Sequence, residues 1–398
     1  AGTGKSTLLQ LFRNTTKKKC VVLAPTGIAA LNVQGQTIHS FFGFPPRLLN
    51  QSEIKRRRFR KLFIELDCII IDEISMVRAD MLDNIDYFLR INREDSNPYG
   101  AVQMIFFGDL FQLPPVVRSD VERRMFTQTY KSPYFFSAHV MRQAPVQMIE
   151  LQEAYRQTSR HFLRILDNVR MSHADYDDLE DLNQRHVPDF EASDFYVTLS
   201  ARNATVDAIN KSRLEALPGP ELTYTARTTG SFAPHLFPSE GILKLRLGAQ
   251  VMFIKNDPQR RFVNGTIGKV VHLDPDEVKV LVDEGGKQDE ITLEKMEWEI
   301  RKYRAPQNDG DEIKSEVVGT FKQFPIKLAW AITIHKSQGK TFERVIIDMG
   351  RGAFEHGQTY VALSRCRTLE GIVLKKPLQP RDIMVDPRIV SYYEDAIR

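Results

Sequence analysis

The sequence predicts an α/β fold with parallel sheets, built in two halves. Three observations predict it. Residues 2–7 form a glycine-rich stretch that leads directly into a helix. Residues 68–71 form an apolar strand that ends in two acids. Strand, loop and helix alternate in both halves, starting at residues 20–23 and again at residues 195–200. This alternation is typical of parallel sheets that carry functional groups on their loops.

The composition predicts a protein with two or more domains. The chain has 398 residues, of which 42% are hydrophobic and 27% charged, as in ordinary globular proteins. No apolar run has membrane-spanning length and no signal peptide is visible, so we expect no membrane partner. Cys20, Cys68 and Cys366 lack metal-ligand spacing, which favours packing roles and a reducing, intracellular compartment. A net charge of +4 permits a polyanionic partner.

The glycine-rich stretch is typical of a phosphate-binding loop. Gly2 and Gly4 allow consecutive N–H groups to point at one anion, and the helix that follows adds its positive end. Lys5 is expected to reach the β- and γ-phosphates of a nucleotide, and the Ser6 hydroxyl to bind Mg²⁺. The full pattern has one more glycine, two positions before Ala1.

The next stretch offers two interpretations. After strand 20–23, the turn Ala24-Pro25-Thr26-Gly27 opens a helix, and residues 37–42 interleave hydroxyls with aromatics. These residues favour a helix start with apolar packing; the alternative is a contact with single-stranded nucleic acid. Residues 43–62 then interrupt the alternation of strands and helices and contain a basic run at 55–61. That run is either a solvated face or a small insertion that touches nucleic acid.

Acids and a glutamine follow two apolar strands. Asp72 and Glu73 come directly after strand 68–71; Asp72 is expected to hold Mg²⁺ through its water shell, and Glu73 to polarise the attacking water. Helix capping is the alternative role for the two acids. Gln112 lies in the loop after strand 104–107, placed to sense the γ-phosphate or to position water. Arg156 offers a charge for the transferred phosphoryl group, although on its own it is typical of a helical surface residue.

The second half repeats the α/β pattern around an insertion. Strand 195–200 and helix 203–217 precede an expected loop at 218–241. Short strands with tight Asn-Gly and Gly-Gly turns predict a small inserted β-barrel at about 258–323. The α/β pattern then resumes at 326–341. His335, in a loop after a strand, is expected to contact DNA or relay the nucleotide state, and Arg365 offers a second charge for the γ-phosphate.

The motifs together resemble those of superfamily 1B helicases. Eight motifs occur in the family's order, from residue 1 to about 374. They are AGTGKST, APTGIAA, TIHSFF, IIIDEIS, FFGDLFQLPPV, EAYRQ, AITIHKSQGKTF and YVALSRCR. The chain is most similar to the Pif-one family, relatives of RecD, with a family-like stretch from Asp80 to Ile105. The family's adenine-holding glutamine lies before the phosphate loop.

The resemblance implies two RecA-like domains with ATP between them, at 1–190 and 191–398. It also implies a wedge insertion at about 43–66 and an SH3-like character for the insertion at about 258–323. The implied activity is ATP-driven 5′-to-3′ movement on single-stranded DNA, with unwinding of duplex and often G-quadruplex DNA. The implied settings are replication, recombination, repair and telomere maintenance, in the bacterial cytoplasm or in a nucleus or mitochondrion. Single-stranded DNA, strand junctions and RNA–DNA hybrids are expected partners of an active monomer.

The resemblance also implies roles for single residues. Lys5, Ser6, Asp72 and Glu73 hydrolyse ATP and Gln112 senses it, while Arg156 and Arg365 are arginine fingers, a part worth ~10³–10⁵ in rate. The implied nucleotide contacts are Gly2, Thr3, Gly4, Lys5, Ser6, Thr7, Gln338 and Gly339. The implied DNA contacts are Pro25, Thr26, Gly27, Thr37, His39, Ser40, Phe41, Thr333, His335, Lys336 and Ser337.

Two rival functions stay open from the sequence. One is a translocase that hydrolyses ATP along DNA without unwinding it, against which the wedge insertion argues. The other is a DNA-binding scaffold with a vestigial ATPase site, against which the joint presence of Lys5, Glu73, Gln112 and both arginines argues. RNA as the track also stays open.

Overall fold

The structure is a computed structural model that describes residues 2–117, 119–284, 287–306, 308 and 311–397. The chain divides into two compact units. Unit 1 comprises residues 1–3, 153–298 and 321–386, and unit 2 comprises residues 4–152, 299–320 and 387–398. None of the described helices combines the length and apolar character needed to cross a membrane.

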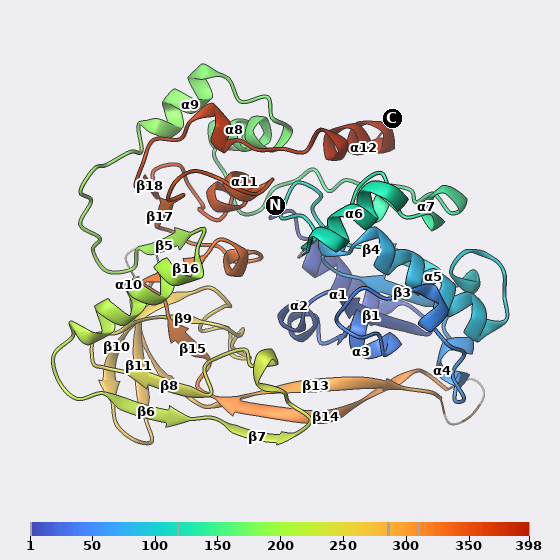
Figure 1. Cartoon of the computed structure of the whole chain (residues 1–398). Helices are drawn as coiled ribbons and strands as arrows, with labels where there is room; N and C mark the ends of the chain where they lie inside the picture. Colours follow the sequence, from blue (N-terminus) through green and yellow to red (C-terminus); the bar gives the residue numbers. More distant parts are fainter. Residues whose placement is uncertain (1, 118, 285–286, 307, 309–310, 398) are drawn as a thin grey trace. The chain divides into compact units, whose positions relative to one another are not determined.

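Unit 2 is built on a parallel sheet in the order β2-β1-β3-β4 (Figure 1). Its strands are β1 (Cys20–Ala24), β2 (Gln36–Thr37), β3 (Cys68–Ile71) and β4 (Gln103–Phe106). β3 is buried along its whole length, as expected for a central parallel strand of Cys and Ile. The helices of this unit are α1 (Lys5–Thr15), α2 (Gly27–Asn32), α3 (Ile38–Phe42), α4 (Lys61–Ile64), α5 (Ala79–Arg93), α6 (Asp120–Thr129), α7 (Val140–Gln143) and α12 (Pro387–Ile397).

Unit 1 carries a second parallel sheet, in the order β16-β5-β17-β18. Its strands are β5 (Val197–Ser200), β16 (Ala331–Thr333), β17 (Val345–Asp348) and β18 (Ile372–Leu374). The helices here are α8 (Arg160–Met171), α9 (Tyr176–Asn183), α10 (Asn203–Glu215) and α11 (Gln358–Leu363). Two parallel sheets therefore confirm the predicted α/β class.

The insertion in the second half is antiparallel, as its short strands and tight turns predicted. A five-stranded sheet runs in the order β12-β11-β10-β9-β15. Its strands are β9 (Gln250–Phe253), β10 (Ile267–Leu273), β11 (Val278–Glu284), β12 (Lys287–Leu293) and β15 (Ile326–Leu328). Gly265 has a φ of 107° at the predicted Asn-Gly turn, whereas the predicted Gly-Gly turn, at 285–286, lies outside the described residues.

The expectation that residues 218–241 form a loop is wrong. β6 (Leu222–Thr225) lies in this stretch and pairs with β8 (Ile242–Leu245), and β7 (Arg227–Gly230) joins a sheet with β13 (Met296–Arg304) and β14 (Lys314–Gln323). The threonines and the tyrosine of this stretch favour extended backbone. Pairing to strands elsewhere in the sequence outweighs the flanking prolines and glycines.

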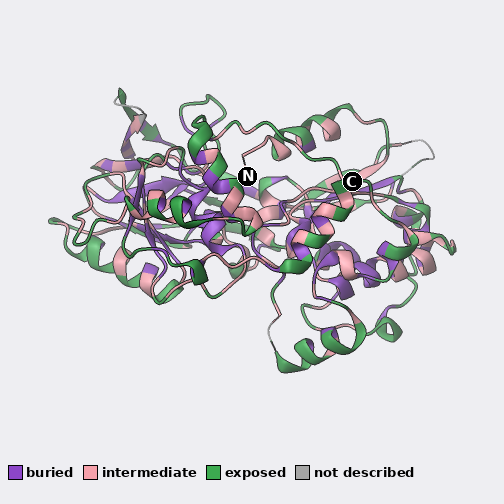
Figure 2. Cartoon of the chain, turned by 90° about the horizontal axis from the view of Figure 1, so that it is seen from above, coloured by how far each residue is buried: buried purple, intermediate pink, exposed green. Residues whose placement is uncertain are grey.

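A large hydrophobic core of unit 2 packs beneath α5. Phe88 is fully buried and meets Phe42 and Phe63 edge-on, with ring centroids 5.2 and 4.8 Å away. Figure 2 shows the buried residues concentrated on the sheet strands, while exposed residues cover much of the helices. This core holds β1 and β3 rigidly, so the loops at their carboxyl ends have a fixed base.

The compact units group the chain differently from the predicted division at residue 190. The Gln157 side chain donates to the carbonyls of Ser364 and Cys366 at 3.1 and 2.9 Å, which ties residues from 153 onward to the second sheet. Phe136 and Tyr392 stack at 4.2 Å, which ties α12 to the first sheet. The domain boundary at 190, with its wedge and SH3-like insertions, stays a prediction from the family resemblance.

Candidate functional site

The phosphate-loop residues of unit 2 begin a helix at Lys5. Gly4 precedes α1 in the left-handed region, with a φ of 81°, and its carbonyl accepts from the Leu8 N–H at 3.0 Å. Leu9, which is fully buried, anchors the helix to the sheet, while Ser6 remains exposed on its first turn. A glycine at the turn and a long helix after it leave N–H groups available to an anion.

Asp72 stands at the carboxyl end of β3, close to Lys5. Its N–H donates to the carbonyl of Leu23 at 2.9 Å, which continues the parallel ladder by one residue. Burial raises the pKa of Asp72, while a hydrogen bond from the Glu73 backbone and the charge of Lys5 pull it down. A half-buried carboxylate beside an ammonium group is suited to a divalent cation bound with phosphate.

Glu73 adopts a backbone conformation that is rare for its residue type. Its φ and ψ are 53° and 47°, in the left-handed region. Such a conformation costs of order 1–3 kcal/mol and persists where the surrounding structure imposes it. Here the next residue, Ile74, donates to the Phe107 carbonyl at 2.9 Å and so bends the chain sharply after Asp72.

These residues fit ATP with Mg²⁺. A glycine turn before a helix, a lysine at the first helical position and a partly desolvated aspartate are the donor and acceptor set that a magnesium-bound triphosphate requires. The hard oxygens of Ser6 and Asp72 suit Mg²⁺ rather than a soft metal.

Gln112 is buried and held by a neighbour that the sequence reasoning did not identify. Its amide nitrogen donates to Asp109 Oδ2 at 2.9 Å, and its side chain is only 7% exposed. Asp109 follows β4 at the same edge of the sheet as Asp72, since both strands are parallel. Gln112 is therefore fixed in orientation near the loops that follow β1, β3 and β4.

Arg156 lies outside any helix, contrary to the helical placement considered from the sequence, and connects two segments of unit 1. Its Nε donates to Thr341 Oγ1 at 2.8 Å and its Nη1 to the Ser364 carbonyl at 2.9 Å. A Cβ added to Gly2 would lie 2.6 Å from the Arg156 Cβ, so only glycine fits there. The sequence reasoning missed Thr341 and Ser364, although both stand inside quoted motifs.

Arg365 is almost completely buried, at 1% exposure. Its Nε donates to the Val361 carbonyl at 3.0 Å and its Nη2 to Ser364 Oγ at 2.8 Å. Arg156 and Arg365 therefore meet the same residue, Ser364, through its carbonyl and its hydroxyl. The two predicted arginines form one cluster in unit 1.

Several predicted DNA contacts of unit 2 also serve local structure. Thr26 Oγ1 accepts from the Ala29 N–H at 3.3 Å, and Thr37 Oγ1 from the Ser40 N–H at 3.2 Å, so both cap helices. Pro25 and Gly27 flank the first cap, half-buried, and His39 is half-buried in α3. Ser40 is exposed.

The expected aromatic contact at Phe41 requires correction. The Phe41 ring is 7% exposed and packs edge-on against Phe42 and Tyr303, with centroids 4.9 and 6.0 Å away. Burial in the core removes its face from any base, so the packing interpretation holds for this residue.

The second group of predicted DNA contacts, in unit 1, turns two hydroxyls inward. Thr333 Oγ1 accepts from the Lys336 N–H at 3.2 Å and Ser337 Oγ donates to the Ile334 carbonyl at 2.7 Å, and both residues are buried. His335 pairs with Glu355 at 2.9 Å. The side chain of Lys336 is exposed, Gln338 is half-buried, and Gly339 is exposed with a φ of 74°.

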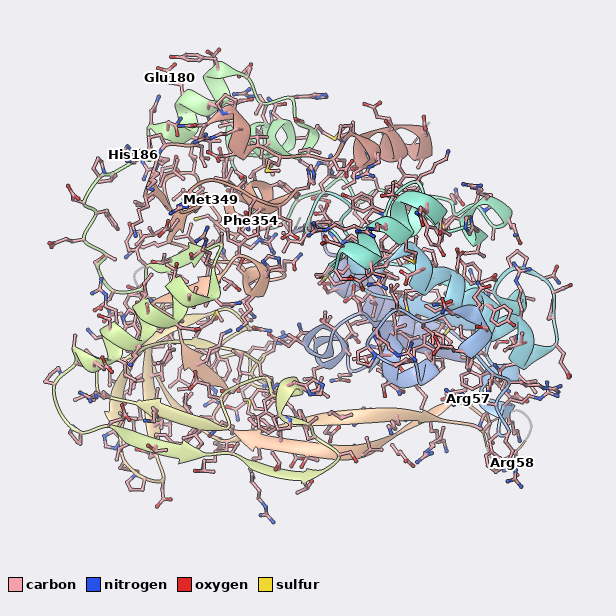
Figure 3. All side chains as sticks on the ribbon, viewed as in Figure 1. Arg57, Arg58, Glu180, His186, Met349 and Phe354 are labelled. Atoms are coloured by element: carbon pink, nitrogen blue, oxygen red, sulfur yellow. The ribbon has the colours of Figure 1, made fainter. Side chains whose placement is uncertain are left out.

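The basic run at 55–61 divides into anchored and exposed residues. Arg57, labelled in Figure 3, donates to the Phe42 carbonyl at 2.7 Å, and its own N–H donates to Asn92 Oδ1 at 2.7 Å. Arg58, also labelled there, stands over the ring of Phe59, which is 84% exposed. The run is thus fastened to α5 on one side and offers a cation and an aromatic ring to solvent on the other.

Comparisons with known proteins agree on one family. The model of the PIF1-like helicase family matches residues 1–176, and the model of the DNA helicase Pif1 2B domain matches residues 234–273. The ATP-dependent DNA helicase Pif1 of Bdellovibrio bacteriovorus is 33% identical over 406 residues, covering 99% of this chain and 86% of the relative.

A human relative and a solved structure extend the agreement. The human ATP-dependent DNA helicase PIF1 is 32% identical over 409 residues, and the chain spans 60% of that relative's length. The structure of Bacteroides sp Pif1 in complex with ADP-AlF4 matches at a TM-score of 0.92 and 37% identity, covering 99% of this chain and 91% of that one. On these grounds the chain belongs to the PIF1-like helicases, a family of ATP-dependent DNA helicases.

Proposed function

We propose that this protein uses ATP hydrolysis to move 5′-to-3′ along single-stranded DNA and unwinds duplex DNA, with G-quadruplex DNA as a further substrate. The observation that carries the proposal is the half-buried Asp72 beside Lys5 at the end of β3, with Glu73 bent sharply after it. Bacteroides Pif1 has been solved bound to single-stranded DNA, and a further similar structure concerns DNA unwinding at forked duplex DNA by two coordinating Pif1 helicases. Both support DNA as the track.

Each residue of the unit 2 cluster receives a proposed role in hydrolysis. Lys5 binds the β- and γ-phosphates, together with the backbone of residues 2–7. Ser6 and Asp72 hold Mg²⁺, which when bound neutralises the phosphate charge. Glu73 accepts a proton from the attacking water, and Gln112, oriented by Asp109 at 2.9 Å, responds to the γ-phosphate.

Arg156 and Arg365 are proposed to stabilise the charge on the transferred phosphoryl group. Arg365 is buried and bonded to Val361 and Ser364, so its role requires the guanidinium to exchange these neutral acceptors for phosphate. That exchange is favourable because a guanidinium and a phosphate carry opposite charges and form bidentate hydrogen bonds, which a single carbonyl or hydroxyl cannot match. Gln338 and Gly339 are proposed to contact the nucleotide from the same unit.

The DNA track is proposed to use the accessible members of the predicted set. Thr26, Ser40, His335 and Lys336 reach solvent, half-buried Thr37 caps α3, and the buried Thr333 and Ser337 support their loop from within. Contacts of this kind meet sugar and phosphate, so we expect little sequence preference.

The first test is ATP hydrolysis with and without single-stranded DNA, against Lys5→Ala and Glu73→Gln. We expect strong stimulation by DNA that both variants lose. Glu73→Gln should still bind nucleotide, because the amide replaces the proton acceptor but leaves Lys5 and Ser6 in place. Full turnover in Glu73→Gln would refute the general-base role. Hydrolysis that ignores DNA would favour a nucleotide switch, and no hydrolysis would favour the scaffold alternative.

Unwinding is tested separately with tailed duplexes. A duplex with a 5′ tail should be unwound and one with a 3′ tail should not. The double variant Arg58→Ala/Phe59→Ala should lower unwinding while leaving DNA-stimulated hydrolysis, since both side chains are exposed in the insertion at 43–66 and neither belongs to the core. Intact unwinding in this variant would count against the proposed wedge role.

The remaining family properties are proposed on the same resemblance. These are RecA-like domains at 1–190 and 191–398, action as a monomer, and binding at strand junctions or RNA–DNA hybrids. The proposed settings are replication, recombination, repair and telomere maintenance, in the bacterial cytoplasm, or in a nucleus or mitochondrion.

A further inference from the structure

Unit 2 contains a cavity of about 630 Å³ apart from the loops that follow β1, β3 and β4. It is lined by α6, residues 129–133, Arg142 of α7 and Arg388 at the start of α12. α6, α7 and α12 are labelled in Figure 1. Among its described lining residues there are four cations and no acid. That imbalance selects an anionic occupant.

The four cations come from separate elements. They are Arg123, Lys131, Arg142 and Arg388, and all four are exposed. Within the part of the chain that the structure describes, neither Lys131 nor Arg142 has an ion-pair partner. Arg123 has an exposed pair with Asp120 at 3.4 Å, which is worth little in water. The charges of Lys131 and Arg142 therefore remain available at the rim of the cavity, and that of Arg123 is only weakly compensated.

The walls of the cavity are held in place by contacts between separate segments of unit 2. The Pro133 carbonyl accepts from the Ala79 N–H at 2.9 Å, which ties the 129–133 segment to the start of α5. Tyr130 stacks on His139 with ring centroids 4.9 Å apart. Arg388 donates to the Lys131 carbonyl at 3.3 Å and stands over the Tyr134 ring, which holds α12 against the same segment.

The arrangement of charge identifies the class of ligand. Cations on several elements around an open cavity match several phosphates in a chain better than a single compact anion. Such contacts are made to the backbone of nucleic acid without regard to sequence. We propose that this cavity binds the phosphodiester backbone of DNA outside the motor's track, in the duplex part of a fork.

A DNA site in this cavity goes beyond the proposed motor activity. It rests on the proposed function only in taking DNA as the polyanion. A second contact would keep the junction near the motor while the tracked strand moves, because it adds affinity that does not depend on the nucleotide cycle. Salt dependence reports such contacts directly, since each phosphate neutralised adds about 0.9 to the slope of log affinity against log salt on duplex DNA.

The test compares the full chain with the double variant Lys131→Gln/Arg142→Gln. Affinity is measured across a salt series for a 5′-tailed fork and for a short single strand that only fills the track. For the fork, the slope should fall by about 1.8, two contacts at about 0.9 each. For the short strand, neither affinity nor stimulated ATP hydrolysis should change.

The matched control is Lys17→Gln/Arg124→Gln, which removes the same charge from exposed positions of unit 2 outside the cavity. Its fork slope should stay at the wild-type value. If the cavity variant keeps the wild-type slope of log affinity against log salt for the fork, the proposal is overturned. That result is expected if the occupant is an acidic peptide or a free nucleotide and not DNA. An equal loss of affinity for the fork and for the short strand also overturns the proposal, because it would mean that these cations contact the strand in the track. Wild-type hydrolysis that ignores the short strand would instead count against the motor, independently of the fork comparison.

Discussion

The Tyr303 hydroxyl accepts a hydrogen bond from the Val22 N–H at 2.9 Å, although the two residues are 281 positions apart. β2 consists of only two residues, which pair with Leu23 and Ala24 and do not reach Val22. The Tyr303 N–H also donates to Gln36 Oε1 at 3.2 Å. A tyrosine from the β13–β14 ribbon thus completes the first parallel sheet where its own strand stops.

Removing this hydroxyl should expose one sheet amide. Tyr303→Phe keeps the packing against Phe41 but leaves the Val22 N–H without its acceptor, a loss of about 1 kcal/mol. Hydrogen exchange at Val22 should become roughly fivefold faster. Tyr176→Phe, at a tyrosine that is 78% exposed, is the control. Equal protection at Val22 in wild type and Tyr303→Phe would contradict the role of the hydroxyl.

The glycine at position 2 should be required for the fit of Arg156. Gly2→Ala places a methyl group 2.6 Å from the Arg156 Cβ, at a φ of 76°. Gly219 has a similar φ of 85°, but a Cβ added there would meet no atom within 4 Å. Gly219→Ala therefore measures the cost of backbone strain alone, about 1–2 kcal/mol.

We expect Gly2→Ala to lower the thermal midpoint more than Gly219→Ala and to weaken ATP binding, which Gly219→Ala should spare. Equal midpoints for the two variants would show that Arg156 adjusts without cost.

Lys327 should make stability depend on pH. Burial lowers the pKa of Lys327 to about 7, with the charges of Lys340 and Lys336 acting in the same direction and Glu240 opposing them. The unfolded chain holds that proton up to about pH 10.4. The unfolded state therefore binds more protons between about pH 7 and 10.4, so stability rises with pH in this window.

Lys327→Met should remove that dependence. At pH 6 we expect the variant to unfold at higher denaturant concentration than wild type, and at pH 9 the difference should shrink. Exposed Lys17→Met should show neither effect. A constant difference between wild type and Lys327→Met across the range would mean that Lys327 titrates normally.

Cys20 should be the most reactive thiol. Cys20 and Cys68 occupy paired positions on β1 and β3, and a hydrogen bond from the Cys68 thiol lowers the pKa of Cys20. Burial raises the pKa of Cys366 to about 12. Iodoacetamide followed by mass spectrometry should label Cys20 first, with Cys20→Ser as control. Earlier labelling of Cys68 or Cys366 would contradict this order.

The sequence by itself determined the features that depend on neighbours along the chain. The glycine turn before Lys5, the acids after β3 and the alternation of strands with helices are local, because turn chemistry and apolar runs act over a few residues. The order of the motifs was sufficient to indicate the family. These features predicted the α/β class, and the structure confirms it.

Tertiary structure decided what each of these residues touches. Arg156 meets Ser364 across 208 positions, and Tyr303 fills the edge of a sheet that begins near the other end of the chain. Phe41 is buried because a ribbon and an aromatic cluster close over it. No local pattern encodes such pairs, since their energy comes from desolvation and from hydrogen bonds that form only once distant segments meet.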